Sequence, residues 1–241
     1  MKRIIDIRPA LVYDVDGIME VEAESFGEVS QGAMASPDMM VSRIGLLNSN
    51  SSKWFWVASY KGRIVGYIVM QPTDLTPEEA ISWDGCTDNG TLFRTFNVDG
   101  DNIYGVSGAA IEKQGVPGVY DLLLHKLLVL WLQSRKRRFF LCSRMPGYKS
   151  ASEKGISPEK YWQKKDSLGR PADWMLKLYY ESLGLMPVRL LQNGFSVDEE
   201  SGGHAVLCVG DDPLRSLDLL VDRIYRSGLA FGKQTIKKGK Q

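Results

Sequence analysis

The sequence predicts a mixed α/β (α+β) fold, in which a central, mostly antiparallel sheet is flanked by helices. One observation is a pair of strand-like runs over 54–71, rich in Val, Ile and aromatic residues and joined by Lys61-Gly62, which is typical of an antiparallel hairpin. Another is the order strand, apolar helix, strand over 102–143, which indicates one crossover connection. Because no repeat or low-complexity linker interrupts the 241 residues, we expect one domain.

Composition and charge argue against several classes of function. Thirty Lys and Arg against 29 Asp and Glu give a net charge of +1, which provides no global attraction for nucleic acid or an anionic membrane. Cys86, Cys142 and Cys208 are odd in number and widely spaced, so we expect neither a disulfide framework nor a metal site. No apolar run approaches the ~20 residues of a membrane span, and Asp6 comes too early for a signal peptide. We expect a cytoplasmic protein.

Short local signals predict the N-terminal elements. Residues 3–8 alternate weakly, as a short strand would. Asp14 or Asp16 can cap a helix that continues through Phe26. Ser36-Pro37-Asp38 begins a second helix, because proline is favoured at the first helical position.

Two long polar stretches, at about 72–101 and 145–171, are predicted to be insertions. We expect one short helix in each, over 76–83 and from Ser157. Because connections of this length are usually functional, we expect both to form one side of a substrate cleft. Four aromatic residues in or beside them could wall a pocket or pin the insertions to the core: Trp83, Tyr161, Trp162 and Trp174.

The C-terminal third predicts a helix over 172–183 that ends at Gly184, followed by two antiparallel strands over 187–191 and 204–209. Asp211-Asp212-Pro213 begins a predicted C-terminal helical extension.

The loop before the central helix is the first candidate site. Gln114-Gly115-Val116-Pro117-Gly118-Val119 leads into a helix over 119–136 that is apolar around most of its circumference, which places the helix inside the fold. Free N–H groups and the positive end of the helix dipole suit a phosphate at this point. Pro117 removes one donor from the cradle.

The chain resembles the GNAT superfamily of acyl-CoA N-acyltransferases over most of residues 3–209. Ile7-Arg8-Pro9-Ala10 before an acidic helix is similar to the opening of that fold, and the hairpin over 54–69 is similar to its second and third strands. Tyr180-Glu181-Ser182-Leu183-Gly184-Leu185 resembles its Tyr-x-x-x-Gly-Phe segment. The signature loop Arg/Gln-x-x-Gly-x-Gly/Ala falls on 114–119, where Pro117 and Val119 depart from the pattern.

The resemblance implies an acyl-CoA-dependent N-acyltransferase, with acetyl-CoA as cosubstrate and a small-molecule or peptide amine that attacks directly. It also implies that the fourth strand and the following loop hold the coenzyme. The expected coenzyme-binding residues are Ala109, Ala110, Ile111, Gln114, Gly115, Val116, Gly118, Val119 and Tyr120. Small residues in the strand, such as Gly105 and Gly108, let the pantetheine arm approach closely or serve packing alone.

Tyr180 is the expected general acid, since a phenol is protonated at pH 7 and can give its proton to a departing thiolate. Its spacing to Gly184 favours it over Tyr179, which points about 100° away on the same helix. Arg144 could hold an anion or form an ordinary ion pair. No general base stands out; besides water, the candidates are Asp101, Tyr104, Glu112 and His204.

Two other classes stay open at this point. A GNAT-like domain that has lost catalysis could bind CoA or another ligand as a sensor or partner module; the altered loop favours it and Tyr180 opposes it. An FAD- or NAD-binding protein would need several parallel strand–helix units, and the sequence contains one. The identity of the acceptor and a homodimer are left open.

Overall fold

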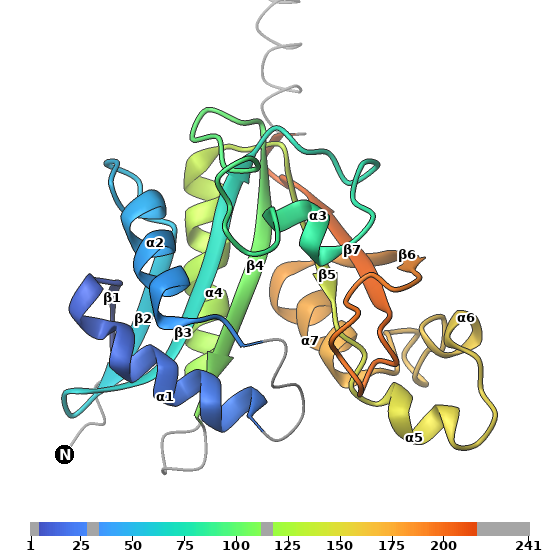
Figure 1. The fold of residues 1–241 in the computed structure, drawn as a ribbon. Coiled ribbons are helices and arrows are strands. Elements are labelled where there is room, and N and C mark those ends of the chain that lie inside the picture. Colours follow the sequence, from blue (N-terminus) through green and yellow to red (C-terminus); the bar gives the residue numbers. More distant parts are fainter. Residues whose placement is uncertain (1–4, 28–33, 112–117, 216–241) are drawn as a thin grey trace, which may run out of the picture.

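The computed structural model describes residues 5–27, 34–111 and 118–215. Within these residues, one seven-stranded sheet has the order β1-β2-β3-β4-β5-β7-β6 (Figure 1). Every neighbouring pair is antiparallel except β4 and β5, which are parallel. The predicted fold class is confirmed. The strands are β1 Asp6–Pro9, β2 Phe55–Tyr60, β3 Arg63–Thr73, β4 Asn102–Ala110, β5 Arg138–Ser143, β6 Met186–Leu191 and β7 Ala205–Asp211.

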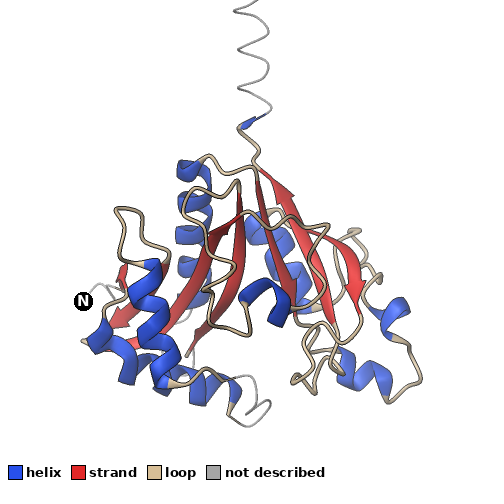
Figure 2. Ribbon diagram, turned by 45° about the horizontal axis from the view of Figure 1, so that its top comes forward, coloured by secondary structure: helices blue, strands red, loops and turns tan. Residues whose placement is uncertain are grey.

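Helices cover both faces of the sheet. Gly66 and Tyr67 are neighbours in β3 and point to opposite faces: a Cβ on Gly66 would meet Val119 and Leu123 of α4, whereas the Tyr67 hydroxyl bonds to Glu22 of α1. Figure 2 shows the same two layers around the sheet. The helices are η1 Val12–Asp14, α1 Val15–Phe26, α2 Pro37–Leu47, α3 Trp83–Thr87, α4 Val119–Ser134, α5 Tyr148–Ser152, α6 Pro158–Tyr161 and α7 Trp174–Leu183.

Several helix ends follow the signals in the sequence. The Ser36 hydroxyl accepts the Met39 N–H at the start of α2, as the Ser-Pro pair predicts. The Asp173 carboxylate accepts two N–H groups at the start of α7, and Gly184 ends that helix with φ 69°. Asp14 behaves differently from the prediction, because its carboxylate accepts from Arg8 and from the Leu11 N–H rather than capping α1.

The two insertions differ in detail from the prediction. Residues 77–79 form a turn instead of the predicted helix. The short α3 begins at Trp83 because the Ser82 hydroxyl caps it by accepting the Gly85 N–H. Helix α5 was not predicted. At the C-terminal end, Asp211 belongs to β7, and the predicted extension beyond residue 215 lies outside the described residues.

β4 and β5 diverge after a short seam. They pair only over Asn102–Gly105 with Arg138–Leu141, and a register shift against β3 leaves Val106 as a bulge. Beyond Gly105, β4 continues to Ala110 without β5 beside it. Among the described residues, no strand therefore pairs with this edge of β4 beyond Gly105.

Among the described residues, no helix is long and apolar enough to cross a membrane.

Candidate active site

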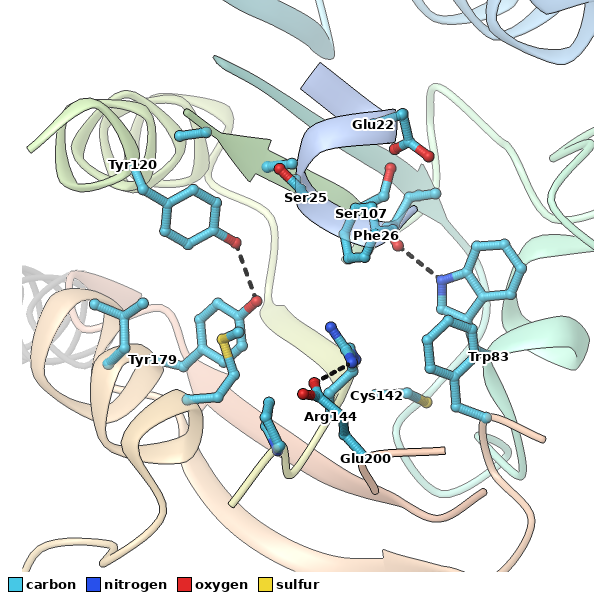
Figure 3. Close-up of a pocket in the computed structure, with 18 of the residues that line it drawn as sticks. Glu22, Ser25, Phe26, Trp83, Ser107, Tyr120, Cys142, Arg144, Tyr179 and Glu200 are labelled. Carbon is cyan, nitrogen blue, oxygen red and sulfur yellow. Dashed lines mark hydrogen bonds and ion pairs between the residues drawn. The ribbon is translucent and has the colours of Figure 1, made fainter. Parts of the chain in front are cut away.

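A cavity of about 650 Å³ lies where β4 and β5 diverge (Figure 3). Residues 106–110 of β4 form one wall, and Cys142 and Arg144 lie on the β5 side. Glu22 and Phe26 reach it from α1. Helices, strands and both insertions thus contribute to one cavity, since Trp83 comes from the first insertion and Pro146 from the second.

The β4 wall offers polar groups to an extended ligand. The Ser107 hydroxyl is buried and has no hydrogen-bond partner in the described part of the chain. The Trp83 indole N–H donates to the Val106 carbonyl oxygen at 2.7 Å, so the aromatic ring is fixed beside the bulge. Trp83 also packs on Phe195, with ring centroids 5.4 Å apart. One end of the cavity is therefore aromatic.

Two tyrosines define the other end, as Figure 3 shows. The hydroxyl oxygens of Tyr120 and Tyr179 lie 3.2 Å apart, and burial raises the pKa of each phenol. Both side chains line the cavity, whereas Tyr180 is not among its lining residues. The residue next to the predicted one therefore occupies the site, because the Tyr-x-x-x-Gly spacing fixed the helix end but not which side chain faces inward.

Glu22 is a buried acid that the sequence interpretation missed. Its side chain is 2% exposed; the Tyr67 hydroxyl bonds to one carboxyl oxygen and the Ala35 N–H donates to the other at 3.3 Å. Burial raises its pKa to about 7, against the opposing effects of the Ala35 N–H and the Arg43 charge. A signal existed: Glu22 lies between Ile18 and Phe26 at helical spacing, inside the apolar stripe of α1.

Two arginines line the same cavity, and they differ in whether a carboxylate neutralises their charge. Arg144 donates to both Asp198 and Glu200 at 2.7–2.9 Å, so its charge is already matched. This is the ion-pair alternative of the two predicted for it. Arg43 is 2% exposed and donates to the Gly90 carbonyl at 2.7 Å; within the described ranges, no carboxylate lies at ion-pair distance from it.

The expected coenzyme residues fall into three groups. Ala109, Ala110 and Tyr120 line the cavity. Ile111 and Val119 are buried in the core, and Gly118 precedes α4 with φ 80° and open space beside it. The rest of the set, Gln114, Gly115 and Val116, lies outside the described residues, as do Glu112 and Pro117.

The described candidates for the general base do not line the cavity, and two of the four aromatic residues near the insertions do. Asp101 is exposed, Tyr104 is buried beneath the β4 wall, and His204 packs against the Tyr148 ring. Of the four aromatic residues near the insertions, Trp83 and Trp174 line the cavity, while Tyr161 and Trp162 do not. Among the described residues, no three His, Cys, Asp or Glu side chains gather as a metal site would need.

No protein-family model and no curated protein matches the sequence. Solved structures do match over most of the chain. The loading GNATL domain of CurA from Lyngbya majuscula matches with a TM-score of 0.73 and 17% identity, covering 87% of this chain and 98% of that one. The GphF GNAT-like decarboxylase in complex with isobutyryl-CoA matches with a TM-score of 0.71 and 19% identity, covering 86% and 98%.

The chain has the GNAT fold. A Sinorhizobium meliloti phosphinothricin acetyltransferase of the GNAT superfamily, in complex with AcCoA, also matches, with a TM-score of 0.51 and 14% identity over 86% of this chain and 88% of that one. Acyl-CoA ligands therefore occur in two of these GNAT-fold structures, and the CurA domain and the decarboxylase superpose better on this chain than the acetyltransferase does.

Proposed function

We propose that this GNAT-fold protein is an acyl-CoA-dependent N-acyltransferase that acts in the β4–β5 cavity. The observation that carries the proposal is Glu22: a buried carboxyl, with a pKa near neutrality, lines the same cavity as the open edge of β4. A general base works best when its pKa is close to the working pH. Acetyl-CoA is the proposed acyl donor and an amine the proposed acceptor.

The β4 edge and the start of α4 would hold the coenzyme. Ser107, with its unpartnered hydroxyl, and the backbone of Gly108–Ala110 are free to meet the amides of an extended pantetheine arm. The N-terminus of α4, directly after Gly118, suits a phosphate.

Tyr179 would support the leaving group. Its hydroxyl remains protonated at neutral pH because burial raises its pKa, and it can donate a hydrogen bond to a departing thiolate. Complete proton transfer from so weak an acid is uphill, so its main contribution is as a donor in a low-dielectric site. Tyr120 orients that hydroxyl from α4.

Glu22 would take the proton from the attacking amine. The aromatic walls formed by Phe26, Trp83 and Phe195 favour an acceptor with an apolar body and a cationic nitrogen, since a cation is attracted to ring faces. The bound ammonium first loses one proton to solvent, which frees the lone pair for attack, and the nitrogen loses a second proton to Glu22 as the amide bond forms.

A second candidate is decarboxylation of a carboxyacyl-CoA. It is favoured by the higher TM-score of the structure named a GNAT-like decarboxylase, and by Arg43, a buried guanidinium in the cavity that could bind a carboxylate.

One experiment separates these functions. The protein is incubated with acetyl-CoA or malonyl-CoA, with and without a panel of primary amines, and free CoA and acyl-CoA masses are followed. Amine-dependent release of CoA from acetyl-CoA supports the proposal. Loss of carbon dioxide from malonyl-CoA without an amine selects the second candidate. A thermal shift with CoA but no turnover in either assay selects the sensor instead.

A further inference from the structure

Cys142 places a thiol at the point where the two strands part. It follows Leu141, whose partner Gly105 is the last β4 residue paired with β5, and it lines the cavity. Side chains alternate along a strand, so Cys142 shares a face of the sheet with Phe140. The Phe140 ring packs on Tyr104, with ring centroids 5.2 Å apart. Figure 3 shows Cys142 on the side of the cavity away from Tyr120 and Tyr179.

The face that Cys142 shares is the one covered by α3. Tyr104 lies opposite Gln71 of β3, and the Gln71 amide donates to the Cys86 carbonyl of α3 at 2.8 Å. The tyrosine pair comes from α4 and α7 on the other face. A thiol on one face and a thiolate-stabilising hydroxyl on the other suit attack on a thioester carbonyl held between them.

Cys86 and Tyr104 are the neighbours of Cys142 on this face. The Tyr104 hydroxyl is fully buried and has no hydrogen-bond partner among the described residues. The proximity of the two thiols lowers the pKa of Cys142 and, together with burial, raises the pKa of Cys86. Cys208, by contrast, is fully buried and does not line the cavity, and its thiol donates to the Val206 carbonyl oxygen.

We propose that Cys142 accepts the acyl group from the CoA thioester before an acceptor receives it. This rests on the proposed binding of acyl-CoA in the cavity and replaces direct attack by the amine. The Cys142 thiol releases its proton to solvent, and the thiolate sulfur forms a bond to the carbonyl carbon. The bond to the CoA sulfur breaks, and the CoA thiolate takes up a proton from solvent. In the second half-reaction the amine nitrogen bonds to the same carbon, the Cys142 thiolate leaves, and Glu22 accepts the amine proton.

The test combines intact mass with binding. Wild type, Cys142→Ala and the matched control Cys208→Ala are mixed with acetyl-CoA without acceptor, quenched in acid and weighed, and peptides are mapped. We expect wild type and Cys208→Ala to gain one acetyl group, on Cys142, removable by neutral hydroxylamine. Cys142→Ala should gain none, and its transfer rate to an amine should fall by roughly 10²-fold or more. Initial rates in wild type should follow a ping-pong pattern.

Calorimetric titration with acetyl-CoA distinguishes the possible failures. Normal binding and turnover without an adduct, or full turnover in Cys142→Ala, overturns the acyl-cysteine and leaves the proposed function standing. Absence of binding in wild type overturns both. Cys142→Ser, which preserves side-chain shape, guards against misfolding: a folded Ser variant with wild-type transfer also overturns the proposal.

Discussion

The hydroxyls of Tyr120 and Tyr179, 3.2 Å apart, join the first turn of α4 to the last turns of α7 at one end of the cavity. Residues 59 positions apart in the chain are thereby held in one hydrogen bond, and the half-buried setting raises the pKa of both phenols. The donor that faces the proposed thiolate is therefore held by a second tyrosine rather than left to rotate.

Replacing Tyr179 by Phe should lower the acyl-transfer rate by roughly 10²-fold, because one preorganised donor to the leaving group is lost. Acetyl-CoA affinity and folding should barely change. Tyr180→Phe is the matched control, since the same atom is removed one residue away and outside the cavity. Steady-state rates with acetyl-CoA measure both; equal losses would indicate disturbed packing of α7 instead.

Glu22→Gln should lower the transfer rate by roughly 10²–10⁴-fold, the range for one acid–base group. In wild type, the rate should rise with pH through about 7, where the Glu22 carboxyl loses its proton. That limb of the pH–rate profile should be absent from the variant. Persistence of the limb in Glu22→Gln would assign it to another group. Glu20→Gln, an exposed position on the same helix, serves as the control.

The raised pKa of Glu22 should make the protein less stable as the pH rises. An ion-paired acid, whose pKa is lowered, has the opposite effect. Between pH about 4.5 and about 7, folded Glu22 keeps its proton while the unfolded chain has released it. The free energy of unfolding should therefore fall as pH rises through this window, by roughly 3 kcal/mol from this group. Urea unfolding at pH 4.5 and 7.5 gives the free energy of unfolding of wild type and of Glu22→Gln. The difference between the two proteins at each pH isolates the contribution of Glu22, because the other acids are common to both. A difference independent of pH would contradict the raised pKa.

Acetyl-CoA should raise the melting temperature of wild type, and Gly118→Glu should remove most of that rise. Glutamate adds a negative charge where a phosphate is expected, at the start of α4. Gly155→Glu is the matched control: Gly155 has φ 73° and Gly118 has φ 80°, and both have open space for a side chain. Each substitution should cost about 1 kcal/mol of backbone strain, so only the ligand-induced shift should distinguish them. Equal shifts in the two variants would place the phosphate elsewhere.

Much of the fold could be predicted because its signals are local. The hairpin turn at Lys61-Gly62, the Ser36-Pro37 helix start and the Gly184 helix end each depend on a few neighbouring residues, and the structure contains all three elements. The short α3 was misplaced because its cap, Ser82, is followed by only five helical residues and its position depends on tertiary contacts. One is the Trp83 indole bond to Val106, which joins residues 23 positions apart.

The site was harder to predict because its parts come from distant segments. Glu22 reads as one of several acids on α1, and only burial under Tyr67 raises its pKa. The motif spacing favours Tyr180, whereas the contact with Tyr120, which depends on the packing of α7 against α4, is made by Tyr179. The proximity of Cys86 to Cys142 depends on how the first insertion folds over the sheet, which no pattern in the sequence states.

The short seam between β4 and β5 also has a mechanical consequence. The sheet is in effect two ribbons, β1–β4 and β5–β7, that share backbone hydrogen bonds only over Asn102–Gly105 and Arg138–Leu141. Bending of the sheet should therefore concentrate at the β4–β5 seam, beside the cavity. A ligand that contacts both ribbons should restrict that bending. Amide exchange at the seam would then report occupancy of the cavity, even though the exchanging groups lie in the interior of the sheet.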